Sequence, residues 1–243
     1  MTTGELHVLG AFDLTDAEGH SVASTPAAQR LLGYLAIRER LTSRSSIACS
    51  LWPEASRSFG AMRLRSTLAR LAPEARALVD VRDSGLQLDP TCVVDYRQAR
   101  TSAEHVLGPA GLAGALTDDD TRAVITQLEL DLLPDSYDNW ALEQAEDWRL
   151  MRAEALEALA AALSLNDRPH LAMQAVLAAI RNEPLRETAH ATLCGLHIRA
   201  GNHGEAVRAL ERYCRALAVA YSVSPSPRFR ALIDTLHTTP PEL

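Results

Sequence analysis

The sequence contains no lysine, so all 24 of its basic residues are arginine. A phosphate-binding loop of the Walker-A type, a Schiff-base enzyme and a lysine nucleophile all need a lysine amine. The sequence therefore excludes these reaction classes before any motif is considered.

Cysteine is also scarce, and long apolar runs are absent. The four cysteines, Cys49, Cys92, Cys194 and Cys214, form no C-x-x-C pair, which is typical of reduced thiols in a cytosol. The N-terminus lacks the basic and apolar regions of a signal peptide, and no apolar stretch approaches the roughly 20 residues that a bilayer requires. We expect a cytoplasmic protein with no membrane partner.

Signatures of catalysis and metal binding are missing as well. The eight histidines contain no H-E-x-x-H, and no serine lies in a G-x-S-x-G context. His190 and His197 lie seven residues apart without a cysteine or carboxylate to complete a zinc set. The sequence predicts that the chain is not an enzyme and has no catalytic residue, metal site or cofactor.

The net charge of -7 hides an asymmetry along the chain. Residues 1–100 carry 12 arginines and 11 acids, whereas residues 101–243 carry 12 arginines and 20 acids. Within the first part, the stretch from Arg38 to Arg76 has eight arginines and three glutamates, a net charge of +5. A local basic patch is what phosphate contact requires, although a solvated helix face has the same composition.

The first 90 residues have the pattern of a winged helix-turn-helix. Leu6–Leu14 and Ser21–Ala23 predict a short N-terminal hairpin or meander. Thr25-Pro26 predicts a helix start, with a first helix over 26–38. A second helix begins at Thr42-Ser43 and ends at Trp52-Pro53, and a third covers 57–71. Residues 78–81 and 86–88 predict a closing hairpin, with Gly85 supplying the turn.

In this arrangement the third helix enters the major groove of DNA. Its apolar residues Ala61, Leu64, Leu68 and Leu71 predict a buried stripe, which turns Arg63, Ser66, Thr67 and Arg70 outward together. Arginine guanidinium groups and the hydroxyl groups of serine and threonine on such a face contact bases and phosphates. The predicted DNA-contacting residues are Arg57, Arg63, Arg65, Ser66, Thr67, Arg70, Arg44 and Arg82.

From about residue 95 the composition becomes that of an alanine-rich helical domain. We expect helices over 95–107, 119–130, 138–164, 168–182, 187–200, 204–221 and 227–236. The segments Ala172–Ala175 and Ala206–Ala209 are similar and lie 34 residues apart, which is the tetratricopeptide (TPR) period. The expected fold is therefore mainly α with a small β component: a winged-helix domain over 1–95 and a TPR-like helical domain over 96–243.

Several motifs together resemble one family. In the first half these are Leu51-Trp52-Pro53 and the run from Leu64 to Leu71, which are similar to OmpR-like DNA-binding domains. In the second half they are the run from Leu132 to Trp140, the run from Asn182 to His190, and Ser224 to Pro227. The chain thus resembles the SARP (Streptomyces antibiotic regulatory protein) activators, which join an OmpR-like winged helix to a bacterial transcriptional activation domain.

The resemblance implies a sequence-specific transcriptional activator. It would bind direct repeats in promoter DNA as a dimer or tandem pair and recruit RNA polymerase holoenzyme through its sigma factor or alpha subunit. The regulated genes would belong to a secondary-metabolite, antibiotic-producing cluster. By the same resemblance, Trp52 and Glu54 lie where OmpR-like activators present polymerase contacts. An alternative is a protein-interaction module that uses the TPR-like groove while the winged helix does not read DNA.

Overall fold

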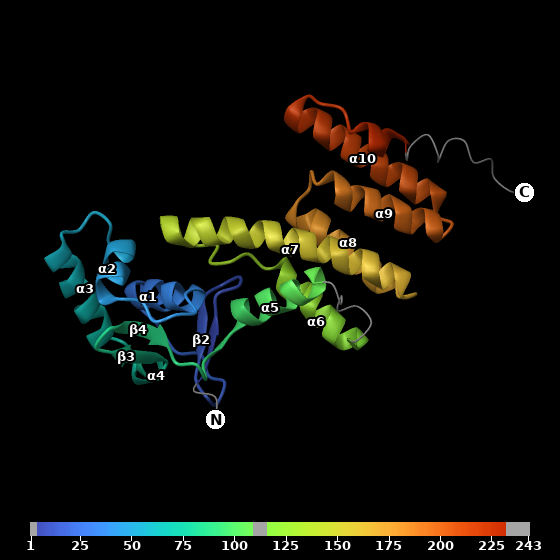
Figure 1. Cartoon of the computed structure of the whole chain (residues 1–243). Helices are drawn as coiled ribbons and strands as arrows, with labels where there is room; N and C mark the ends of the chain where they lie inside the picture. The colour runs from blue at the N-terminus through green and yellow to red at the C-terminus, as the bar shows by residue number, and fades with distance from the viewer. Residues whose placement is uncertain (1–3, 109–115, 232–243) are drawn as a thin grey trace, which may run out of the picture. The chain divides into compact units, whose positions relative to one another are not determined.

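A computed structural model describes residues 4–108 and 116–231 (Figure 1). The chain forms two compact units, and neither unit is continuous in sequence. The first consists of Met1–Thr101 with Leu130–Arg149, and the second of Ser102–Glu129 with Leu150–Leu243. The helices α5 (Asp95–Leu107) and α7 (Asn139–Leu165) contribute residues to both units.

A small sheet opens the first unit. Strands β1 (Glu5–His7) and β2 (Asp13–Thr15) pair in antiparallel register with Leu6 opposite Leu14, as the predicted hairpin requires. A further strand, β5 (Val93–Val94), which was not predicted, pairs in parallel with β1 and gives the strand order β2-β1-β5. A strand of two residues is too short for a period of two to be visible.

Three helices follow the hairpin, as predicted: α1 (Pro26–Ile37), α2 (Arg44–Leu51) and α3 (Arg57–Ala69). Each begins after a residue whose hydroxyl accepts a hydrogen bond from a backbone N–H of the first turn: Thr25, Ser43 and Ser56. Such caps satisfy donors that the helix itself leaves free. The apolar side of α1 forms the core of the unit, with Leu31, Leu32 and Leu35 fully buried.

The wing hairpin consists of β3 (Val79–Arg82) and β4 (Gly85–Leu88), with Val79 opposite Leu88. Pro73 begins a further short helix, α4 (Pro73–Ala77), which the sequence analysis had not assigned. Gly85 does not act as a positive-φ turn residue, contrary to our expectation. The backbone of Gly85 lies close to the residues just before α2, so that an added Cβ would be 2.2 Å from the carbonyl oxygen of Thr42. Thr42 and Leu86 exchange two backbone hydrogen bonds of 2.9 Å at this point.

Residues 130–149 pack within the first unit. The amide of Gly10 donates to the carbonyl of Asp131 at 2.7 Å, and the amide of Leu133 donates to the carbonyl of Val8 at 2.8 Å. Farther along, the rings of Tyr96 and Trp148 meet edge to face at 5.4 Å. The domain boundary at residue 95 remains a prediction. It did not anticipate that residues 130–149 pack with the N-terminal residues.

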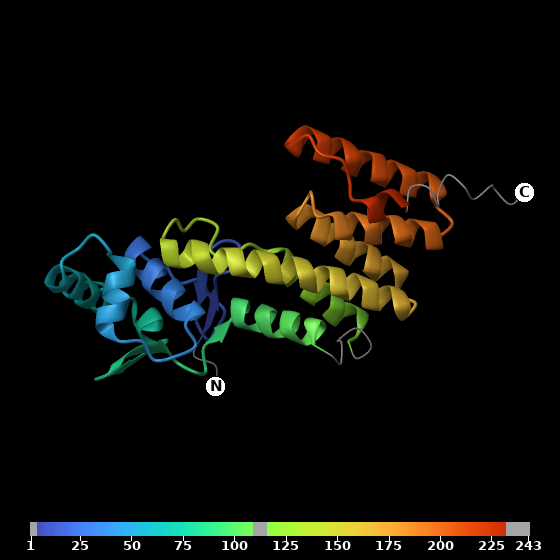
Figure 2. The ribbon, with the colours of Figure 1, turned by 45° about the horizontal axis from the view of Figure 1, so that its top comes forward.

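The second unit is entirely helical in its described part. It contains α6 (Asp118–Glu129), α8 (Pro169–Asn182), α9 (Glu187–Arg199) and α10 (His203–Tyr221), together with the ends of α5 and α7. Successive helices α8, α9 and α10 pack as neighbours, as both views show (Figures 1 and 2). Alanines at the crossings, such as Ala175 and Ala206, are fully buried, which allows close approach of the helices.

The predicted TPR-like architecture is confirmed, with every helix from α5 to α10 within two residues of its expected bounds. The helix expected over 227–236 begins at residue 227, and its residues from 232 onward lie outside the described part of the chain. Within the described residues, no helix is both long and apolar enough to span a membrane.

Candidate nucleic-acid interface

The buried side of α3 is set by small residues as much as by leucines. Gly60, Leu64, Thr67 and Leu71 are buried, with the spacing of one helical stripe. A Cβ on Gly60 would lie 3.4 Å from the Cβ of Ala48, so α2 and α3 are close together at this position. Ala61 and Leu68, which the sequence analysis placed in the core stripe, are only partly buried.

This rotation corrects one predicted contact. Thr67 is 8% exposed, and its hydroxyl donates to the carbonyl of Arg63 at 3.0 Å. Thr67 therefore belongs to the packed side of α3 and is not presented to a duplex. Leucine spacing alone could not show this, because a threonine of small volume fits either face.

The exposed side of α3 is basic. Arg57, Arg63, Arg65 and Arg70 are all exposed, as is Ser66. Among the described residues, Arg57, Arg65 and Arg70 form no ion pair with an acid. Their charges are thus available to an anionic partner.

Arg63 differs from these because it lies against aromatic rings. Its guanidinium carbon is 5.3 Å from the ring centre of Phe59 and 6.0 Å from that of Trp52. A cation over aromatic faces keeps its charge while its side chain is held in place. Trp52 itself is 9% exposed, whereas its neighbour Glu54 is exposed in the loop between α2 and α3.

Two apolar side chains stand on the same exposed side and were missed by the sequence analysis. Phe59 is 47% exposed and Met62 is 48% exposed. At 100° per residue, Met62 lies almost opposite the Leu64–Thr67–Leu71 stripe, with Ser66 beside it. A helical wheel centred on Gly60 and Leu64 would have found Met62.

A hollow of about 470 Å³ is lined by residues of α2, of the loop after it and of the start of α3. It is lined by Arg44, Ser45, Ser46, Ser56 and Arg57 together with small residues, and no acid lines it. Residues of the first turns of both helices line it, and a helix start carries the positive end of the helix dipole. These features favour an anion such as a phosphate.

The wing lies near this hollow through a direct contact. Arg44 donates from Nη1 to the carbonyl of Asp83 at 3.0 Å, at the tip of the wing. Arg82, the predicted wing contact, is paired with the Asp80 carboxylate at 2.8 Å, and Gln87 donates to that carboxylate as well. The charge of Arg82 is therefore partly balanced, unlike the charges of Arg57, Arg65 and Arg70.

Comparison with protein families identifies the second half of the sequence. Residues 128–237 match the family model of the bacterial transcriptional activator domain. This part of the chain is similar to a bacterial transcriptional activator domain. The matched region includes the segment from Leu130 to Arg149, which belongs to the first unit together with residues 1–101.

The fold agrees with that of a solved structure. The structure of Mycobacterium tuberculosis EmbR in complex with a low-affinity phosphopeptide is similar over 98% of this chain, with a TM-score of 0.70 and 20% identity. The chain spans 65% of the length of that protein. Comparison with curated proteins gave no match. Together, the activator domain and the fold support the SARP-type resemblance drawn from the sequence motifs.

Proposed function

We propose that the chain binds double-stranded DNA through α3 and the adjoining helix starts, and activates transcription by contacting RNA polymerase. The observation that carries the proposal is the surface formed by the exposed side of α3 and the hollow beside it. This surface combines arginines that form no ion pair among the described residues with helix N-termini. The activator domain supports the transcriptional role.

The parts of this surface suit different contacts with a duplex. Ser66 and Met62 lie near the middle of the exposed side of α3, where base edges would be met; an apolar side chain there suits the thymine methyl group. Arg65 and Arg70 lie on either side of Ser66 and Met62 and can reach guanine edges or phosphates. The guanidinium of Arg63 is kept in place by its contact with the ring of Phe59. Arg44 and Arg57 suit phosphates because they border the hollow.

The wider role rests on the resemblance. We infer that the chain occupies direct repeats as a dimer or tandem pair, activates a secondary-metabolite cluster in the bacterial cytoplasm and performs no catalysis. Glu54 is the polymerase-contact candidate that is accessible, whereas the buried Trp52 acts on that loop through packing.

The test uses duplexes that the purified full chain selects from a random library. Affinity is measured by fluorescence anisotropy at several salt concentrations for wild type and for R57A, R65A and R70A. Each loss of a phosphate contact should lower the slope of log affinity against log salt by about 0.9, and each loss of a base contact should reduce discrimination by about 1–3 kcal/mol.

R215A is the matched control, because Arg215 is exposed on α10 and makes no ion pair among the described residues. It should leave both affinity and salt slope unchanged. Failure to select any duplex, or equal losses in R215A and R65A, would refute DNA binding by α3 and favour the protein-interaction alternative.

A further inference from the structure

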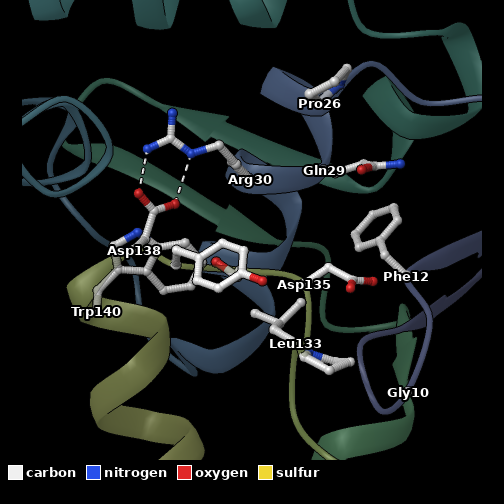
Figure 3. A pocket seen from close by; sticks show the side chains of 12 residues that line it. Gly10, Phe12, Pro26, Gln29, Arg30, Leu133, Asp135, Asp138 and Trp140 are labelled. Atoms are coloured by element: carbon white, nitrogen blue, oxygen red, sulfur yellow. Dashed lines mark hydrogen bonds and ion pairs between the residues drawn. The ribbon is translucent and has the colours of Figure 1, made fainter.

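The first unit contains a cavity that DNA binding does not use. It has a volume of about 400 Å³, within the range of small-molecule sites. Its walls come from the turn after β1, the start of α1 and the segment that precedes α7 (Figure 3). All of these elements belong to the same compact unit.

Most of the wall is apolar or aromatic. Phe12 and Pro26 line one part of the cavity, and Leu133 and Trp140 line another. Trp140 is held by an edge-to-face contact with Tyr34, their ring centres 5.2 Å apart. Its buried Nε1 has no hydrogen-bond partner among the described residues, which is unusual for a buried donor.

The wall has a fixed shape. Leu133 has a φ of +46°, a conformation that leucine rarely adopts, and its amide is tied to the carbonyl of Val8. Gly10 has a φ of +70°, and its amide donates a hydrogen bond to the carbonyl of Asp131. A strained residue such as Leu133 is often found at ligand sites, where the surrounding structure maintains its conformation.

Two carboxylates line the cavity, but only one of them is neutralised. Asp138 accepts two hydrogen bonds from Arg30, at 2.6 and 2.7 Å. Asp135 makes no ion pair or hydrogen bond with the described residues. Figure 3 shows Asp135 on the Phe12 side, apart from the Arg30–Asp138 pair. The cavity therefore combines aromatic walls with one uncompensated negative charge.

We propose that this cavity binds a small aromatic amine. The ring would lie against Phe12, Leu133 and Trp140, and the ammonium would pair with Asp135. Aromatic faces attract cations as well as apolar groups, so both parts of such a ligand are matched. A neutral ligand would lose the ion pair, and an anionic one would be repelled by Asp135.

Binding at this site would also stabilise a junction between the two parts of the sequence. Phe12 and Pro26 belong to the winged-helix part, whereas Leu133, Asp135 and Trp140 belong to the activator domain. A ligand that touches both binds only when the two segments are packed together. It should raise the melting temperature of the full chain by an amount that grows with the logarithm of its concentration above Kd. This proposal does not depend on DNA binding.

The test compares three probes of similar size by isothermal titration calorimetry with the full chain: tryptamine, which is cationic, 3-ethylindole, which is neutral, and indole-3-propionate, which is anionic. Tryptamine should bind up to about fivefold more tightly than 3-ethylindole, because Asp135 is exposed and an ion pair to an exposed carboxylate contributes modestly. Indole-3-propionate should bind least.

The variant D135N should reduce the affinity for tryptamine to that for 3-ethylindole. E143Q is the control, because Glu143 is an exposed acid on α7 that does not line the cavity. F12A should weaken both tryptamine and 3-ethylindole. Absence of binding by tryptamine at millimolar concentration, a preference for the anion, or an unchanged preference in D135N would overturn the proposal.

Discussion

The contact between the wing and the start of α2 provides a prediction whose size can be worked from distances. In the variant G85A the added methyl would lie 2.2 Å from the Thr42 oxygen, 2.7 Å from its carbonyl carbon and 3.2 Å from the Ser43 nitrogen. All three are backbone atoms, so no side-chain rotation relieves the overlap. The strand must move away, and the two hydrogen bonds between Thr42 and Leu86 are lost.

Each such bond contributes about 0.5–1.5 kcal/mol, so G85A should reduce the free energy of unfolding by about 1–3 kcal/mol. Urea denaturation followed by circular dichroism measures this change. The control is G195A in α9, where a Cβ would meet no atom within 4 Å. That substitution should stabilise the chain by about 0.5–1 kcal/mol, because alanine is the better helix former. Wild-type stability of G85A would refute the close-approach explanation for this glycine.

Two further predictions concern buried polar groups. Burial lowers the pKa of His190 below its usual 6.5, and repulsion by Arg212 lowers it further, while a hydrogen bond with the carbonyl of Pro184 opposes the shift. The unfolded chain therefore takes up this proton first as the pH falls, and stability should decrease below about pH 6.5, by at most ~1.4 kcal/mol per pH unit. H190Q should be less sensitive between pH 7 and pH 5, and identical pH profiles of unfolding would count against the assignment. The Arg30–Asp138 pair is partly buried, with Asp138 20% exposed, so D138N should destabilise the first unit by about 1–3 kcal/mol. A thermal melt indistinguishable from wild type would show that the pair is not important for packing.

Local sequence signals were sufficient for most elements of the fold. The helix starts at Thr25-Pro26 and Ser43 follow from capping chemistry, and the 34-residue spacing of similar alanine-rich segments follows from close packing of helix pairs. These rules involve residues that are near one another in the chain. They need no knowledge of the tertiary partner.

Features that depend on distant segments were not predicted. The contacts of Gly10 with Asp131 and of Val8 with Leu133 join residues more than 120 positions apart, and nothing in either segment specifies the other. The cavity beside these contacts could not be predicted from the sequence for the same reason, because its walls come from distant segments. The rotation of α3 was misjudged because Gly60 approaches Ala48, a contact that hydrophobic periodicity does not register. Thr67 was consequently placed on the wrong side, and Met62 was overlooked.

The central claim, that the exposed side of α3 meets DNA, is tested most directly by site-specific photo-cross-linking. A benzophenone amino acid replaces Met62 in one protein and Leu142 in another; both side chains are 48% exposed in the wild type. Each protein is irradiated with a duplex that the wild-type chain selects from a random library. We predict a protein–DNA adduct from position 62 and none from position 142. An adduct confined to position 142, or none from position 62 while the duplex remains bound, would contradict the account.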